Sequence, residues 1–355
     1  MSKNNNLHAA KTAKNDEFYT RFDDINFEIN LAEHGYRPFF KDKVIYCNCD
    51  DPEESNFWKF FKARFNGLKL KKLILTHYDQ EGKSSYKLEY DGERVVKTEL
   101  EGNGDFRSPE CVELLKESDV VVTNPPFSLY REFVALLTKY DKKYVIWANN
   151  NSITYKEIFP LIKENKMWLG YTCNKTLSFA VPNDYRYDEK ETEKIGDGKH
   201  YGKVPAISVF TNLDIPKRHE PMLLGWKFEK GLEMGIYQKY DNYDAYNVDK
   251  VCQIPRDYDG VLGVPITFLD KYCPEQFEIL NANDYRTSDN VPKKSHGLIK
   301  DKEGYIRERE QPMLESASRE LLAPGADGWH INGKRKYARI FVVLRHGFTP
   351  DNQGN

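Results

Sequence analysis

The sequence predicts an α/β protein: a doubly wound, Rossmann-like core followed by a smaller, irregular C-terminal domain. Between residue 43 and about residue 212, short apolar runs typical of buried strands alternate with segments whose apolar residues recur at helical spacing. From about residue 213 this rhythm fades, and short strands, prolines and loops dominate. We therefore expect a mobile polar arm over 1–15, an α/β domain over 16–212 and a second domain over 213–355.

The first helix is expected over about residues 16–32. Asn15 or Asp16 is a suitable N-cap, and apolar residues recur after it at steps of four, three and four: Phe18, Phe22, Ile25 and Ile29.

A β-α-β unit follows. The apolar run 43–49 predicts a strand that ends in Asp50-Asp51-Pro52, and a helix begins at about Ser55. That helix presents a wide aromatic face made of Phe57, Phe60, Phe61 and Phe65. A second strand over 71–76 completes a unit of the length that a right-handed parallel crossover needs.

The runs 86–90 and 94–98 flank Asp91-Gly92 and predict a hairpin, which is either an insertion or an extension of the sheet. Further along the chain we expect a surface loop over 183–203. We expect helices over 109–117, from the end of the loop 124–127 to about residue 139, and over 155–166. Strands are expected over 119–123, 143–147, 167–171, 176–181 and 206–210.

Composition is that of a soluble globular protein of 355 residues with a formal net charge of −2. This charge argues against binding nucleic acid by bulk charge alone, although local basic faces are present. No apolar run approaches a membrane span and the first residues lack the apolar core of a signal peptide, so we expect a cytoplasmic protein. The six cysteines are scattered and the eight histidines do not cluster, which predicts reduced thiols and no metal site.

The strongest functional signal is Asn124-Pro125-Pro126-Phe127, which directly follows a run of valines. Two prolines cannot continue a strand, so the motif is a rigid loop at a strand end, where α/β proteins bind ligands. The Asn124 side-chain oxygen and the Pro125 carbonyl could each accept one hydrogen of an amine and aim its lone pair at an incoming methyl group. Phe127 could stack on a base. The alternative is an ordinary Asn-Pro turn.

Three other stretches could bind a ligand, each with a structural alternative. Asp50 or Asp51 could accept hydrogen bonds from ribose hydroxyls or balance a cationic ligand, or could cap a helix. Asp105 could pair with an adenine amino group while Phe106 lies against its ring, or the two could form a polar turn. Tyr19 or Thr20 could reach a ligand, although capping and core packing explain that segment better.

Basic residues in the second domain are candidates for phosphate contacts: Lys334, Arg335, Lys336 and Arg339. A solvated strand edge would explain them equally well.

Together these residues resemble the EcoRI-type adenine-specific DNA methyltransferases. The resemblance rests on stretches that span most of the chain: 14–20, Val44 to Pro52, 55–57, 71–74, Asn124 to Phe127 and 263–269. The Asn-Pro-Pro-aromatic motif is shared by many amino methyltransferases, whereas Tyr-Cys-Asn-Cys-Asp-Asp-Pro is much more particular. Here it replaces the usual glycine-rich donor loop, so the choice between Asp50 and Asp51 stays open.

The resemblance implies transfer of a methyl group from S-adenosylmethionine to N6 of an adenine in double-stranded DNA. The adenine would have to be flipped out of the duplex, with Phe127 on one face and Phe179 or Tyr185 on the other. Target recognition would lie in 213–355. We expect a monomer, with a separately encoded restriction endonuclease as a possible partner. Two other hypotheses are methylation of RNA or of a protein glutamine, and a DNA-binding protein that has lost catalysis.

Overall fold

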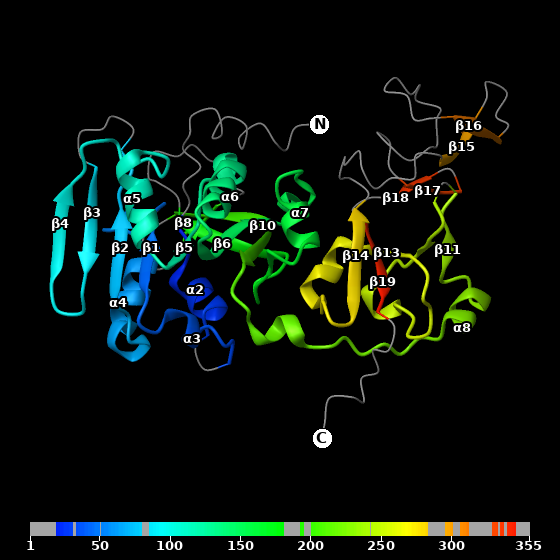
Figure 1. Cartoon of the computed structure of the whole chain (residues 1–355), viewed down its shortest axis with the longest axis horizontal. Coiled ribbons are helices and arrows are strands. Elements are labelled where there is room, and N and C mark those ends of the chain that lie inside the picture. The colour runs from blue at the N-terminus through cyan, green and yellow to red at the C-terminus, as the bar shows by residue number, and fades with distance from the viewer. Residues whose placement is uncertain are drawn as a thin grey trace. The chain divides into compact units, whose positions relative to one another are not determined.

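The computed structural model describes most of the chain (Figure 1), namely residues 19–30, 33–49, 51–79, 85–180, 192–194, 200–241, 243–282, 295–300, 306–311, 329–332, 334–336 and 339–345. By internal contacts the chain divides into two compact units, residues 1–152 with 167–217 and residues 153–166 with 218–355. The predicted arm 1–15 lies outside the described residues. In the part of the chain that is described, no helix is both long and apolar enough to cross a lipid bilayer.

The first unit is built on one large mixed sheet, which confirms the predicted α/β class. Its strand order is β4-β3-β2-β1-β5-β6-β10-β7, and β8 and β9 also pair with β10. The four strands β2, β1, β5 and β6 are parallel, and the flanking strands pair antiparallel. Their bounds are β1 Val44–Cys47, β2 Lys72–Thr76, β3 Tyr86–Tyr90, β4 Val95–Glu99, β5 Val120–Thr123, β6 Lys143–Asn149, β7 Trp168–Leu169, β8 Lys175–Ala180, β9 Thr192–Lys194 and β10 His200–Thr211.

Helices cover both faces of this sheet, as in a doubly wound fold. The unit contains α2 Phe22–Glu28, α3 Arg37–Phe40, α4 Asn56–Leu68, α5 Pro109–Glu117 and α6 Tyr130–Lys139. Helices α2 and α4 share one apolar cluster with alternate residues of the parallel strands, such as Ile45 and Leu73. Tyr46 points to the opposite face, where it meets Cys111 of α5. Tyr130 of α6 packs against Phe210 of β10, whose neighbour Val209 belongs to the cluster of α2 and α4, so helices α4 and α6 cover opposite faces of the sheet.

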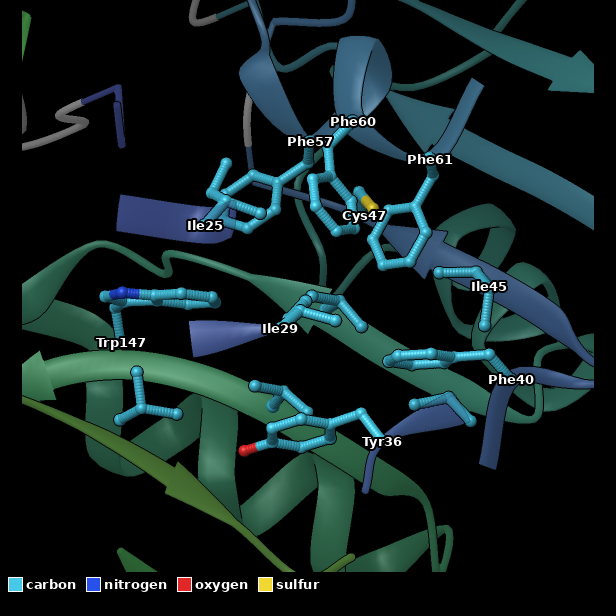
Figure 2. Packing of buried hydrophobic residues seen from close by; sticks show 14 of the residues in the cluster. Ile25, Ile29, Tyr36, Phe40, Ile45, Cys47, Phe57, Phe60, Phe61 and Trp147 are labelled. Carbon is cyan, nitrogen blue, oxygen red and sulfur yellow. The ribbon is translucent and has the colours of Figure 1, made fainter. Parts of the chain in front are cut away.

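Helix α4 forms at the predicted place, with its aromatic face buried against the sheet. Ser55 is its N-cap, and its hydroxyl accepts hydrogen bonds from the backbone N–H groups of Phe57 and Trp58. Its aromatic side chains point toward Ile45 and Cys47 of β1 (Figure 2), and all four predicted phenylalanines are buried. This cluster fixes α4 against the sheet and with it the loop that joins β1 to α4.

In the first unit, the first predicted helix and the predicted surface loop differ from the structure. Within the described residues the predicted first helix begins only at Phe22, because Tyr19 forms an antiparallel bridge with Ala180 and is held in an extended segment; its predicted residues 16–18 lie outside the described residues. The expected surface loop 183–203 contains strand residues at 192–194 and from His200 onward, because β10 continues past its bulge to pair with β8 and β9. The hairpin β3–β4 extends the sheet from the edge of β2.

The second unit is less regular. A five-stranded sheet has the order β11-β12-β13-β19-β14 in the described residues, and two short hairpins are separate from it. The helix expected over 155–166 is reduced to α7, Phe159–Lys163. The remaining bounds are α8 Phe228–Glu233, β11 Gln238–Lys239, β12 Tyr246–Asn247, β13 Leu262–Pro265, β14 Phe277–Ala282, β15 Ser295–Lys300, β16 Ile306–Gln311, β17 Trp329–Ile331, β18 Lys334–Lys336 and β19 Arg339–Leu344.

Candidate active site

The sheet order places a topological switch point between β1 and β5. From β1 the chain passes outward to β2, and it later returns to β5 on the other side of β1 before continuing to β6. Ligands of open α/β sheets bind at such a point, beside the carboxyl ends of the strands. The segment after Cys47 and the segment after Thr123 leave the sheet at this edge, on adjacent parallel strands.

The Asn-Pro-Pro-Phe loop leaves β5 at this edge. Asn124, Pro125 and Pro126 are buried, and Phe127 begins a 3-10 turn that continues into α6. The Pro126 carbonyl accepts a hydrogen bond from Leu129 N–H at 3.0 Å. This contact commits Pro126 to the turn and favours Pro125 as the carbonyl that faces a ligand.

Phe127 is connected through β8 to Tyr19 and Thr20, the segment that was expected to contact the donor. Its ring meets Phe179 of β8 edge-on, with 6.4 Å between ring centroids. The next residue, Ala180, exchanges two backbone hydrogen bonds with Tyr19. Thr20, in turn, accepts a hydrogen bond through its carbonyl from Asn56 Nδ2 at 2.8 Å. The structure thus connects Tyr19 and Thr20 to Phe127 and to the start of α4.

Phe179 itself is fully buried. Its ring therefore supports Phe127 from the core side, and this burial does not favour the predicted stacking of Phe179 on a flipped base. Tyr185, the other candidate, lies outside the described residues.

Asp51 is surrounded by protein donors. Its Oδ1 accepts hydrogen bonds from the Tyr86 hydroxyl at 3.1 Å and from Glu53 N–H at 3.0 Å. Its Oδ2 lies 3.6 Å from His77 Nδ1. Burial and the neighbouring Asp51 carboxylate raise the pKa of Tyr86, so its hydroxyl stays protonated as a donor. Asp50 lies outside the described residues.

Asp105 and Phe106 occupy the loop between β4 and α5. The Asp105 carboxylate is held by Arg107, whose Nε and Nη2 donate to its two oxygens at 2.9 and 2.6 Å. Phe106 is buried and meets Phe133 of α6 edge-on at 5.1 Å between centroids. The Arg107 guanidinium also pairs with Glu132 of α6 at 2.6 Å. A ligand amino group would therefore share Asp105 with Arg107.

The segment that follows β2 contacts both Asp51 and the loop that carries Asp105. This segment was not singled out from the sequence. Gly104 has φ +76° and lies so close to the His77 carbonyl that a Cβ would be 2.1 Å from its oxygen. Asp79 N–H donates to the Asn103 carbonyl at 2.9 Å. Asp79 follows the second parallel strand, where an acidic side chain can reach a ribose hydroxyl. The rule that singled out Asp50 and Asp51, a carboxylate after a parallel strand, would have found Asp79 too.

Two of the four basic candidates have ion-pair partners within the second unit. Lys336 and Arg339 both contact Asp249, at 3.2 and 3.0 Å, and Arg339 Nε also donates to Asn247. Burial raises the pKa of Asp249, but hydrogen bonds from Asn247 and Lys336 and the charge of Arg339 outweigh it and lower the pKa overall. Lys334 and Arg335 lie on β18, paired with β17 in a short hairpin.

A doubly wound sheet with an Asn-Pro-Pro-Phe loop beside a carboxylate-bearing strand end defines a Rossmann-like, methyltransferase-type enzyme core. Comparison with known families agrees: residues 6–345 match the model of the adenine-specific methyltransferase EcoRI family. The chain belongs to this family and is an adenine-specific DNA methyltransferase. The predicted resemblance is thereby confirmed.

Three curated relatives extend this result. The type II methyltransferase M.EcoRI of Escherichia coli is 49% identical in an alignment of 292 positions, which covers 77% of this chain and 88% of that protein. M.MgeORF184P of Mycoplasma genitalium is 40% identical over 95% of this chain and 98% of its own. M.MpnI of Mycoplasma pneumoniae is 39% identical over 96% of this chain and 98% of its own. No solved structure matches the chain significantly.

Proposed function

We propose that this enzyme transfers a methyl group from S-adenosylmethionine to N6 of an adenine flipped out of double-stranded DNA. The observation that carries the proposal is the placement of Asn124 and Pro125 at the end of β5, directly beside the strand that leads into the Asp51 loop. The three relatives named above are all type II methyltransferases, which supports a role in restriction-modification. A separately encoded endonuclease would then be the functional partner, and we propose that the enzyme acts as a monomer.

The residues at the switch point fit the proposed donor. Carboxylates follow both β1 and β2, and a carboxylate at such a strand end can accept hydrogen bonds from ribose hydroxyls or balance a cationic sulfonium. The hydroxyls of Thr20 and Thr123 are buried and have no hydrogen-bond partner among the described residues, so polar groups of a ligand can use them. When bound, the sulfonium supplies an activated methyl group, so the reaction needs no metal.

The protein's contribution is to orient the acceptor amine. An exocyclic amine is a weak nucleophile because its lone pair is delocalised into the ring. The Asn124 Oδ1 and the Pro125 carbonyl oxygen each accept a hydrogen bond from one N–H of the amine, which turns the lone pair toward the methyl group. Because these acceptors sit on a rigid double-proline loop, little reorganisation is needed during the reaction.

Access to N6 requires the adenine to leave the stack, at a cost of a few kcal/mol. Phe127 offers a partly exposed ring beside Asn124, and it is held in place by Phe179. Stacking on an aromatic ring contributes about 1–3 kcal/mol per base, enough to offset much of that cost. We assign recognition of the DNA target sequence to residues 213–355. The candidate phosphate contacts there are Lys334, Arg335, Lys336 and Arg339.

The test is Asn124→Ala. Loss of one acceptor should lower the single-turnover methylation rate by about 100-fold or more, while S-adenosylmethionine binding, measured by calorimetry, stays near the wild-type value. Asn151→Ala is the matched control, because Asn151 is an exposed asparagine after the neighbouring strand β6. Near-normal turnover of Asn124→Ala would refute the assignment.

A methylation assay of the wild-type enzyme distinguishes between the possible substrates. Duplex DNA, total RNA and a glutamine-containing peptide are offered with labelled donor, and only duplex DNA should be methylated at N6 of adenine. Label in RNA or peptide would favour those substrates. A wild-type protein that binds DNA but not the donor would be a catalytically silent DNA-binding protein.

A further inference from the structure

The loop after β1 is held by side chains from the neighbouring hairpin. Tyr86 of β3 donates its hydroxyl to Asp51, as described above. Lys97 of β4 forms an ion pair with Glu53 at 3.0 Å, and its Nζ lies 3.6 Å from the centre of the Tyr86 ring. Two residues of the hairpin thus contact two residues of the loop.

The contact on Asp51 is the better buried of the two. Tyr86 is 6% exposed, whereas the side chains of Lys97 and Glu53 are more than half exposed. Exposed ion pairs contribute little, whereas a hydrogen bond from a buried hydroxyl to a carboxylate is strong. Of these two contacts, the loop therefore depends mainly on Tyr86.

Asp51 also organises the backbone that leads into α4. Its carbonyl accepts hydrogen bonds from Glu54 N–H at 3.1 Å and Ser55 N–H at 2.7 Å. Ser55 is the N-cap of α4. Fixing the Asp51 side chain consequently fixes the whole turn between β1 and α4.

His77 reaches the same carboxylate from the end of β2. Its backbone N–H donates to the Tyr86 carbonyl at 2.8 Å, which continues the pairing of β2 with β3. Its ring lies near Asp51 Oδ2, and its carbonyl lies against Gly104. The ends of β1 and β2 and the start of β3 thus converge on Asp51.

We propose that Asp51 is a positioning residue, held by the Tyr86 hydroxyl with the His77 ring beside it, that keeps the loop between β1 and α4 in the conformation that binds the methyl donor. The hairpin β3–β4 is then part of the donor site and not only an extension of the sheet. The inference rests on the proposed use of S-adenosylmethionine. A loosened loop lowers the population of the binding-competent state, so it weakens binding without changing the chemistry of the bound complex.

Tyr86→Phe tests this role against Tyr90→Phe. Tyr90 lies on the same strand, but its hydroxyl donates to the Gly92 carbonyl in the hairpin turn. Tyr86→Phe should raise the Kd for S-adenosylmethionine about tenfold and leave kcat at saturating donor within about twofold of wild type. Tyr90→Phe should leave both unchanged.

Substitution of Asp51 distinguishes positioning from direct contact. Asparagine keeps an Oδ1 that accepts from Tyr86 and Glu53, so Asp51→Asn should hold the donor Kd within about threefold, whereas Asp51→Ala should raise it at least as much as Tyr86→Phe. An equal rise of the donor Kd in Asp51→Asn and Asp51→Ala would overturn the proposal. Such a result is expected only if the charge of Asp51 contacts the donor directly.

The outcomes separate the two proposals. A wild-type protein that does not bind S-adenosylmethionine refutes the proposed function. A wild-type protein that binds it, with a Tyr86→Phe variant that binds equally well, refutes the positioning role alone. If Tyr86→Phe does not fold, as judged by circular dichroism, the comparison of Asp51→Asn with Asp51→Ala decides.

Discussion

Glu28 is a carboxylate buried in the core of the first unit, and its partners show how one residue connects distant segments. Its oxygens accept hydrogen bonds from the Tyr36 hydroxyl at 2.6 Å and from the N–H groups of Tyr171 and Thr172 at 3.0 and 2.5 Å. A Cβ on Gly170 would lie 2.2 Å from Glu28 Oε1, so this position needs glycine. The contacts tie α2 to the segment before β8, the strand that carries Phe179.

Glu28→Gln should therefore lower the free energy of unfolding by about 1–3 kcal/mol, because the amide NH₂ would face a backbone donor in a buried site. Urea denaturation measures the change. Glu33→Gln is the matched control, since Glu33 is exposed and, among the described residues, its side chain accepts only a surface hydrogen bond from Asn30. Equal stabilities of the two variants would show that Glu28 has no such role.

At the scale of elements, the site is assembled from loops that follow strands. Backbone contacts hold the loop between β4 and α5 against the end of β2, where Gly104 meets His77 and Asn103 meets Asp79. Arg107 then connects this loop to α6 through Glu132, and α6 begins just after the Asn-Pro-Pro-Phe loop. A change in one loop should therefore affect the others.

Gly104→Ala tests this packing. The added Cβ meets the His77 carbonyl, and the positive φ strains any alanine by roughly 1–2 kcal/mol. The Kd for S-adenosylmethionine, measured by calorimetry, should rise more than about tenfold as the loop moves. Gly235→Ala is the control, because Gly235 has a similar φ of +67° but open space around it. If both variants bind the donor normally, close packing of this loop does not matter for binding.

At the scale of the whole molecule, each of the two units has an apolar cluster of its own among the described residues. The large cluster that contains Phe60 lies within the first unit, and the small cluster that contains Phe341 lies within the second. The residues proposed to hold the donor all belong to the first unit. Donor binding should therefore stabilise that unit.

Calorimetric unfolding should show two transitions, of which only one shifts with S-adenosylmethionine. At 100 times the Kd, ligand binding adds about 2.7 kcal/mol to the unit that binds it. Phe60→Leu should lower the shifted transition and Phe341→Leu the other. A single transition, lowered by both substitutions and raised by the donor, would mean that the two units unfold together.

Local patterns in the sequence predicted much of the first unit. Helical spacing of phenylalanines predicted α4, Asp91-Gly92 predicted the hairpin, and valines before Asn124 predicted both β5 and the rigid loop after it. Such features depend on residues close together in the chain, so periodicity and turn chemistry reveal them.

Contacts between distant residues required the tertiary structure. The pairing of Tyr19 with Ala180 keeps Tyr19 out of the expected helix, which starts only at Phe22, and pairing with β8 and β9 turns part of an expected loop into strand. Tyr86 reaches Asp51 across 35 residues, and Thr172 reaches Glu28 across 144. The sequence alone thus determined the class of fold and the family through its strand-end motifs. Only the tertiary structure decided which side chains surround Asp51, because that depends on which strands become neighbours in the sheet.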